Sequence, residues 1–457
     1  MPDQTPLKQL TLSGLLQCPN CKDRQALDLK TLLCSNCNTQ YFHLDGNIPC
    51  LFPAGEHHKA LWQHQAAIMQ SQGQQGLAHV EEALSRYDLT PTTHARLSDT
   101  YHALSASQAT VLRLLAEAGI QPARQKGIGN AGNLSEYYEI MLRDWGWPGE
   151  ENPNALAQAL ACLPNNIKAQ RILVLGAGAA RLSWDLHCAL QPNCTIALDS
   201  NPVLLILANA LIRKRQPIEL AEFKVFPQAG KEFTRSWPLQ PPAENSALAD
   251  SWYALGANAW SAPLEPNSFD LIVTPWFIDV NGGDVRDTIG VVSRLLAPEG
   301  RWLNTGPLLF PRHLPIDQKY QHTEIREFLD LAGFTLEAES LTQAAHLDSP
   351  LEVRKQQEQL WTFCALGPEQ TPASSLTQGK QPPWLVMHHL PVTQHAYISQ
   401  QKHPLIDAIL SLIDGERSIN DIAAHIAPHM PETMSPKDAV VTLLGQILHE
   451  ITEAPKR

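Results

Sequence analysis

A regular alternation of strand and helix patterns, which begins near residue 171, constrains the fold more than any other feature. Residues 171–175 form an apolar run that predicts a buried strand, and 179–190 predict the helix that follows it. A second strand is predicted at 195–198 and a strongly apolar helix at 203–212. Such alternation indicates a mostly parallel sheet with helices on both faces, so we expect an α/β fold with a Rossmann-like sheet. Further strands are predicted at 269–274, 301–304 and 359–366, with a helix at 284–296.

The chain has 457 residues, which is too long for one simple core. We expect a compact cysteine-rich unit, a helical extension of the sheet domain, the sheet domain itself, a proline-rich linker and a small helical or winged-helix domain. The predicted bounds of these five parts are 10–53, 57–166, 167–366, 367–394 and 395–457. Within the last part, short amphipathic helices are predicted at 405–413, 419–426 and 439–451.

Two Cys-x-x-Cys pairs lie near the N-terminus, with twelve residues between them. Each pair can place two thiolates on one edge of a metal ion, and two such pairs complete a tetrahedron. Four protein sulfurs leave no open coordination position, so the predicted metal is a structural zinc ion. The predicted ligands are Cys18, Cys21, Cys34 and Cys37.

The surrounding residues also resemble a known module. The opening Cys18-Pro19-Asn20-Cys21 and the closing turn at residues 45–49 resemble the zinc-ribbon family that includes the activator of tRNA and protein methyltransferases. This resemblance implies that the ribbon packs against a methyltransferase, here within one chain. It also leaves open a protein or peptide partner that docks on the ribbon.

A glycine turn follows the first predicted strand. Gly176 permits the tight turn and Gly178 allows a ligand to approach the backbone closely. Asp199 ends the next strand, where its carboxylate can accept both ribose hydroxyls of an adenosine group. Arg181 replaces the third glycine of a dinucleotide fingerprint, which argues against a nicotinamide cofactor.

A third element points to the same cofactor. The segment Asn258-Ala259-Trp260 precedes the predicted strand at 269–274, as the adenine-edge loop does in class I methyltransferases. The side-chain oxygen of Asn258 can accept a hydrogen bond from the adenine amino group. Trp260 either stacks on the adenine or packs in the core. Together these elements predict S-adenosylmethionine as the cofactor.

Four blocks in the chain resemble the carnosine N-methyltransferase family over residues 135–365: Arg143-Asp144-Trp145, the glycine turn, Trp276-Phe277-Ile278-Asp279, and the Asn-Thr-Gly-Pro-Leu-Leu-Phe segment at 304–310. The resemblance implies an enzyme that methylates a ring nitrogen of histidine in small peptides, using S-adenosylmethionine. It also implies that Arg181 reaches the methionine carboxylate of the donor, with a surface salt bridge as the alternative.

Asp279 comes just after a strand, at the sheet edge where α/β proteins bind ligands. A carboxylate that binds one imidazole nitrogen selects the tautomer whose other nitrogen has a free lone pair. We therefore predict a catalytic role for Asp279, with a turn or capping role as the alternative. Trp276 and Phe277 are expected to shape the acceptor pocket and to favour a cationic donor through their ring faces.

One departure from the family follows the 304–310 block. The family has a histidine near the acceptor there, whereas in this chain Phe310 is followed by Pro311. Either His313 takes over that catalytic role two positions later or the acceptor differs. Phe310 is predicted to contact the acceptor.

The remaining features bear on partners. Residues 404–451 resemble PqqD-like peptide-binding domains, with a packing or dimerisation module as the alternative. The formal charge of −12 argues against a nucleic-acid partner. No apolar stretch reaches the roughly 20 residues of a membrane span, and the N-terminus lacks a signal pattern, so we expect a cytoplasmic protein.

Three functions remain open. The first is an N-methyltransferase for the imidazole of a small molecule or peptide, and the second is a methyltransferase for a macromolecule that docks on the ribbon. The third is an inactive scaffold that binds partners, which the missing third glycine and Asn258 leave open.

Overall fold

The computed structural model forms two units by the contacts between its Cα atoms, one of residues 1–310 and 320–373 and one of residues 311–319 and 374–457. The second is described only in short pieces, which include α12 (Ile419–Ile426), a helix that the sequence predicts with the same bounds. The structure describes residues 12, 14–22, 27–53, 55–124, 134, 137–165, 167–243, 246–280, 284–312, 314–368, 408–409, 411–412, 417 and 419–429.

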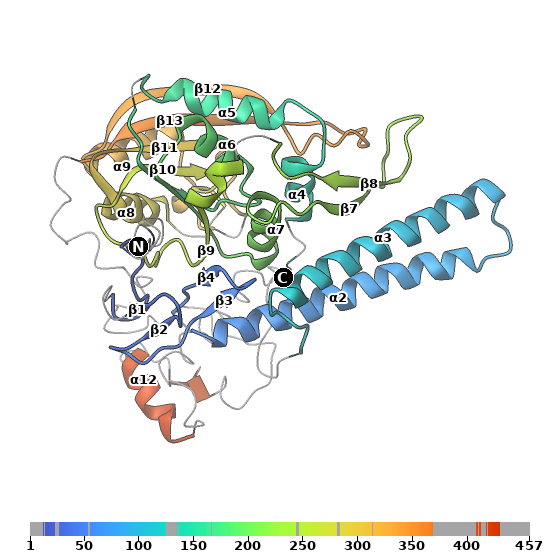
Figure 1. Cartoon of the computed structure of the whole chain (residues 1–457), viewed down its shortest axis with the longest axis horizontal. Coiled ribbons are helices and arrows are strands. Elements are labelled where there is room, and N and C mark those ends of the chain that lie inside the picture. Colours follow the sequence, from blue (N-terminus) through green and yellow to red (C-terminus); the bar gives the residue numbers. More distant parts are fainter. Residues whose placement is uncertain are drawn as a thin grey trace, which may run out of the picture. The chain divides into compact units, whose positions relative to one another are not determined.

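A nine-stranded sheet forms the centre of the first unit (Figure 1). In spatial order it consists of β12 (Thr335–His346), β13 (Gln356–Leu366), β11 (Leu296–Gly306), β10 (Phe269–Pro275), β5 (Arg171–Leu175), β6 (Cys194–Asp199), β9 (Trp252–Gly256), β4 (Ile48–Cys50) and β3 (Phe42–Leu44). Strands β11, β10, β5, β6 and β9 are parallel, whereas β13 is antiparallel to both of its neighbours. This arrangement confirms the predicted α/β fold with a Rossmann-like sheet.

Helices cover both faces of this sheet, because its central strands are apolar on both sides. In β5, Ile172 and Val174 face a cluster that contains α5 (Glu151–Cys162) and α6 (Arg181–Leu190). Leu173 and Leu175 face the opposite cluster, which contains α8 (Val285–Leu295) and α9 (His322–Leu331). The sheet is therefore buried on both faces, as expected for parallel strands.

Two long helices lie between β4 and β5 in the chain. They are α2 (His57–Leu84) and α3 (Pro91–Glu117), which lie side by side and extend away from the sheet (Figure 1). Thr90 caps α3 by accepting from the amide of Thr93. A shorter helix, α4 (Tyr138–Trp145), follows them. None of the helices in the described parts of the chain has the length and apolar character needed to cross a bilayer.

The remaining elements lie outside the nine-stranded sheet. They are the hairpin of β7 (Ile218–Phe223) and β8 (Thr234–Leu239), the hairpin of β1 (Leu27–Asp28) and β2 (Leu33–Cys34), and α7 (Pro202–Ile212).

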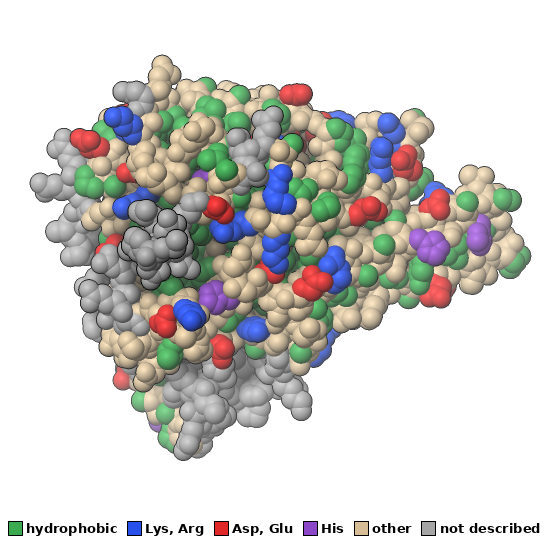
Figure 2. Space-filling view, in the orientation of Figure 1, with side chains coloured by type: hydrophobic (Ala, Val, Ile, Leu, Met, Phe, Trp, Pro, Cys, Tyr) green, Lys and Arg blue, Asp and Glu red, His purple; other side chains and the backbone are tan. Residues whose placement is uncertain are grey.

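On the face shown in Figure 2, acidic and basic side chains are interspersed over the described residues, and they do not gather by sign.

The N-terminal cysteine-rich unit continues the central sheet. Its strand β4 pairs with β9 in parallel at Cys50 and Gly256, and the amide of Leu51 donates to the carbonyl of Gly256 at 2.8 Å. A second junction joins the amide of Gln17 to the carbonyl of Pro263 at 2.8 Å. The hairpin of β3 and β4 thus adds two strands to one edge of the sheet.

The junction at Gly256 is tight, which gives a testable prediction. A Cβ atom at this position would lie 2.7 Å from Sγ of Cys50. We therefore expect Gly256→Ala to lower the free energy of unfolding by about 1–3 kcal/mol, measured by urea denaturation. The control is Gly76→Ala in α2, where a Cβ meets nothing within 4 Å and the helix gains up to about 1 kcal/mol. Equal stability of the two variants would contradict this account of the junction.

Candidate active site

A cavity of about 690 Å³ lies at the carboxyl edge of the parallel strands, a volume typical of small-molecule sites. It occupies the place where the sheet order reverses beside β5, which is where open α/β sheets bind ligands. The loops after five strands supply part of its lining, namely Gly176 after β5, Ser200 after β6, Ala257 after β9, Trp276 after β10 and Pro307 after β11.

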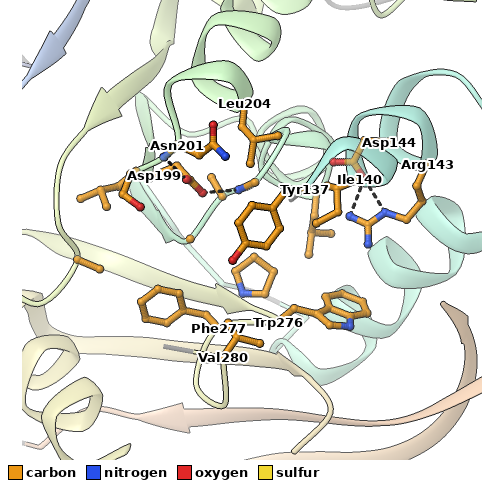
Figure 3. Close-up of a pocket in the computed structure, with 18 of the residues that line it drawn as sticks. Tyr137, Ile140, Arg143, Asp144, Asp199, Asn201, Leu204, Trp276, Phe277 and Val280 are labelled. Carbon is orange, nitrogen blue, oxygen red and sulfur yellow. Dashed lines mark hydrogen bonds and ion pairs between the residues drawn. The ribbon is translucent and has the colours of Figure 1, made fainter. Parts of the chain in front are cut away.

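The glycine turn and Asp199 form one side of this cavity. Gly176 and Gly178 have φ angles of +68° and +58°, which L side chains rarely adopt. Asp199 accepts a hydrogen bond from the amide of Gly178 at 2.8 Å and another from the amide of Asn201 at 2.8 Å (Figure 3). Burial raises the pKa of Asp199, and these amides counteract the rise. The carboxylate is held in place beside the turn.

Gly176 also makes room for an aromatic ring. A Cβ at this position would lie 2.3 Å from Phe277, which follows β10. Phe277 therefore contacts the glycine turn directly, and both line the cavity. Position 176 therefore requires glycine for two reasons, the positive φ angle and the lack of space for a side chain beside Phe277.

The loop after β9 contributes all three residues that the sequence predicts for adenine binding. Asn258, Ala259 and Trp260 line the cavity. Asn258 Oδ1 accepts from the amide of Trp260 at 2.9 Å, which fixes the turn. Trp260 Nε1 is buried and has no hydrogen-bond partner in the part of the chain that the structure describes.

Two blocks that are far apart in the sequence meet at Asp279. The amide of Trp276 donates to the carbonyl of Thr305 at 2.7 Å, and a Cβ at Gly306 would lie 3.0 Å from Cα of Trp276. The amide of Leu309 donates to Asp279 Oδ2 at 2.7 Å. The glycine at 306 thus allows the two segments to approach, and the second segment holds the carboxylate.

The other oxygen of Asp279 has no partner among the described residues. Asp279 is 1% exposed, and its Oδ1 forms no hydrogen bond with any of them. Burial raises the pKa of Asp279 to about 6, while the amide of Leu309 opposes the rise and the charge of Glu358 adds to it. At neutral pH the group is mostly ionised, and Asp279 is part of the cavity lining.

Trp276 is held in an unusual conformation. Its φ angle is +46°, a value that is rare for a bulky residue and often marks a functional site. Its ring lies 5.7 Å from the guanidinium of Arg143 and is stacked with His346 at 6.4 Å between centroids. Trp276 lines the cavity, as Phe277 does (Figure 3).

The structure places two predicted site residues away from the cavity lining. Arg181 forms an ion pair with Asp185 at 2.8 Å and donates to the carbonyl of Asp144 at 3.1 Å. Phe310 is apolar and packs against Tyr320, with 6.1 Å between the ring centroids. His313 lies outside the described residues.

Arg143 is the guanidinium that reaches the cavity. It forms ion pairs with Asp144 at 2.7 Å and with Glu151 at 3.6 Å, and it lies across the cavity from Asp199 (Figure 3). In the sequence, Arg143 is notable only as part of the Arg143-Asp144-Trp145 block. The adjacent Asp144 is the one local signal, because an acidic neighbour can hold a guanidinium in place.

Two more residues of the lining, one at the end of the cysteine-rich unit and one just after it, were missed. Phe52 and His58 line the cavity, and their rings are stacked with centroids 3.6 Å apart. Burial lowers the pKa of His58 to about 4, so its imidazole is neutral at pH 7. Their spacing in the sequence contains no signal for this role.

The four predicted metal ligands lie together. The sulfur atoms of Cys18, Cys21, Cys34 and Cys37 are all within 4.8 Å of one another, and the closest pairs are 3.5 Å apart. A zinc–sulfur distance of about 2.3 Å in a tetrahedron requires sulfurs about 3.8 Å apart. The cluster therefore fits a zinc ion, and this agrees with a zinc ribbon.

Two curated proteins that are similar to this chain in sequence are carnosine N-methyltransferases. The curated carnosine N-methyltransferase of Dictyostelium discoideum is 24% identical over 192 residues, which are 38% of this chain and 40% of that protein. The curated carnosine N-methyltransferase of Rattus norvegicus is 26% identical over 231 residues, which are 45% of this chain and 55% of that protein. This chain is similar to carnosine N-methyltransferases. It spans about half the length of these relatives, and no protein-family model matches it.

Solved structures were also compared with the chain. The N-methyltransferase NodS of Bradyrhizobium japonicum superposes on this chain with a TM-score of 0.32 and 13% identity. The match covers 48% of this chain and 100% of the NodS chain. A SAM-dependent methyltransferase of Aquifex aeolicus superposes with a TM-score of 0.32 and 12% identity. The match covers 51% of this chain and 98% of the Aquifex chain.

Proposed function

We propose that the protein is an S-adenosylmethionine-dependent N-methyltransferase that acts on an imidazole nitrogen of a histidine-containing small molecule or peptide. The observation that carries this proposal is that the glycine turn, Asp199 and Asp279 line a single cavity. The similarity to carnosine N-methyltransferases supports the same reaction class.

The donor would lie along the side of the cavity formed by the ends of β5, β6 and β9. Asp199 can accept from the ribose hydroxyls, and the loop from Asn258 to Trp260 can contact the adenine. Arg143 is the one Lys or Arg side chain among the described residues of the lining, so it is our candidate for the donor carboxylate. The donor would supply an electrophilic methyl group on its sulfonium.

Asp279 would orient the acceptor. Its free Oδ1 can accept the N–H of one imidazole nitrogen, which leaves the lone pair of the other nitrogen available for attack. When that nitrogen becomes methylated, the ring gains a positive charge, and the adjacent carboxylate stabilises it. Asp279 can then receive the N–H proton. In-line positioning of the two substrates supplies most of the remaining rate.

The proposal is tested by incubating the protein with methyl-labelled S-adenosylmethionine and a set of imidazole compounds that includes carnosine. Transfer of label to a ring nitrogen is expected. Binding of S-adenosylhomocysteine without transfer to any imidazole compound would sink the imidazole assignment and favour a macromolecular acceptor that docks on the ribbon. No binding of S-adenosylhomocysteine in calorimetry would leave only the inactive scaffold.

The raised pKa of Asp279 gives a prediction for pH. The ionised carboxylate is the form that accepts the imidazole proton, and its pKa is about 6. We expect kcat/KM for the acceptor to fall as the pH decreases through 6. Because the acceptor imidazole itself takes up a proton with a pKa of about 6.5, the logarithmic slope below pH 6 is expected to exceed one. A limiting slope of one would show that only the acceptor titrates.

A further inference from the structure

A second buried carboxylate lines the same cavity. Glu358 on β13 is 7% exposed, and its Oε1 accepts a hydrogen bond from the side chain of Gln356 at 2.8 Å. Its Oε2 is buried and forms no hydrogen bond with the residues that the structure describes. The Nδ1 atom of His346 lies 3.5 Å from Oε2 without a hydrogen bond between them, and it too is buried and binds none of the described residues.

Among the described residues, no nearby lysine or arginine compensates the charge of Glu358. In the part of the chain that the structure describes, no Lys or Arg forms an ion pair with it. Arg143 is paired with Asp144 and Glu151. Burial lowers the pKa of His346, so this imidazole is neutral near pH 7. An uncompensated buried carboxylate is costly, and a cationic ligand would remove that cost.

The sheet order places Glu358 on the acceptor side. Glu358 and His346 lie on β13 and β12, beyond β10 and β11, whereas Asp199 lies at the end of β6 on the other side of β5. His346 is stacked with Trp276, three residues before Asp279. The charge of Glu358 is felt at Asp279, where it adds to the effect of burial in raising the pKa.

We propose that Glu358 and His346 form a subsite that binds a protonated amine of the acceptor, beside the imidazole that Asp279 would hold. This inference rests on the proposed function and adds the chemistry of the acceptor to it. An ammonium group has three donors. One would bind Oε2 of Glu358 in a charge-assisted hydrogen bond, and a second would bind the free Nδ1 of His346.

The test uses the full chain saturated with S-adenosylhomocysteine and titrated by calorimetry with carnosine or N-acetylcarnosine. These two compounds differ in the charge of the amine. Wild type is expected to bind carnosine about tenfold more tightly or better, as a hydrogen bond to a charged group warrants. Glu358→Gln should bind the two compounds equally, with an unchanged Kd for S-adenosylhomocysteine, and His346→Phe should lose part of the preference while keeping the stacking with Trp276.

The matched control is Glu337→Gln on β12, because that carboxylate is bound by Arg301 and does not line the cavity. It should retain the wild-type preference. Equal binding of the two compounds by wild type, no binding of either, or a preference that survives in Glu358→Gln would each overturn the amine subsite. A preference in binding without any methylation would instead overturn the proposed function and leave the subsite standing. Methylation of both compounds with no preference in binding would overturn the subsite and leave the proposed function standing.

Discussion

Asp279→Asn is expected to lower methyl transfer by about 100-fold or more without weakening the binding of S-adenosylhomocysteine. The amide retains one oxygen for the bond from Leu309, but its NH₂ group donates where the carboxylate accepts. It therefore cannot hold the imidazole N–H or receive its proton. The measurement is the single-turnover rate with labelled donor at saturating acceptor, together with calorimetry of the product complex.

The thermal stability of the Asp279→Asn variant distinguishes a catalytic role of the Asp279 carboxyl group from a structural one. Because folding raises the pKa of Asp279 to about 6, from an ordinary value of 3.8, the folded chain binds a proton more tightly than the unfolded chain does. The contribution of this group to stability is therefore highest at low pH and is lost as the pH rises through 6. Asp279→Asn removes that loss, so its Tm at pH 8 is expected to equal or exceed that of wild type. A lower Tm would indicate the turn or capping role.

Removal of zinc is expected to produce the second large effect. Structural zinc contributes about 10 kcal/mol or more to the folding of isolated zinc-finger peptides, so a chelator should unfold the ribbon. Phe52 and His58 line the cavity, and the neighbouring Leu51 binds Gly256 just before the predicted adenine loop. We expect S-adenosylhomocysteine to bind about tenfold more weakly after chelation, and Tm to fall. Metal content by mass spectrometry verifies the removal.

Single variants test the same point without a chelator. Cys34→Ser removes one predicted ligand and should reproduce the loss of zinc, Tm and affinity. Cys188→Ser changes a half-buried cysteine outside the cluster and should leave the zinc content unchanged. A metal-free chain with the Tm and affinity of the untreated protein would refute this link between the ribbon and the cavity.

The central strands could be predicted from the sequence because burial on both faces makes them continuously apolar. The predicted strand at 171–175 coincides with β5, and the predicted helix at 203–212 is α7 within one residue. The strands β9 and β12 were missed for different reasons. Strand β9 follows a short 3-10 helix (Ser246–Ser251) and not one of the α-helices of the alternation, and β12 alternates exposed and half-buried residues without a strong apolar run. The predicted domain bounds remain predictions.

Site residues could be predicted where a local backbone motif determines their position. They were missed where only tertiary packing brings them to the cavity. The glycine turn and Asp199 follow directly from local sequence, and both line the cavity. Arg181 has the right position in the sequence, but it binds Asp185 and does not line the cavity. Glu358 and Phe52 lie on the cavity only because β13 and the ribbon add to opposite parts of the sheet. No spacing in the sequence encodes such neighbours.

The added hairpin of β3 and β4 has a consequence for how this protein can be shortened. A sheet edge with free amides and carbonyls recruits strands from other chains and promotes aggregation. Here β9 is covered by β4, and the outermost strand, β3, is only three residues long. Deleting residues 1–53 would leave β9 as a bare edge of five parallel strands. Such a truncated chain is expected to self-associate through that edge even if its remaining core stays intact.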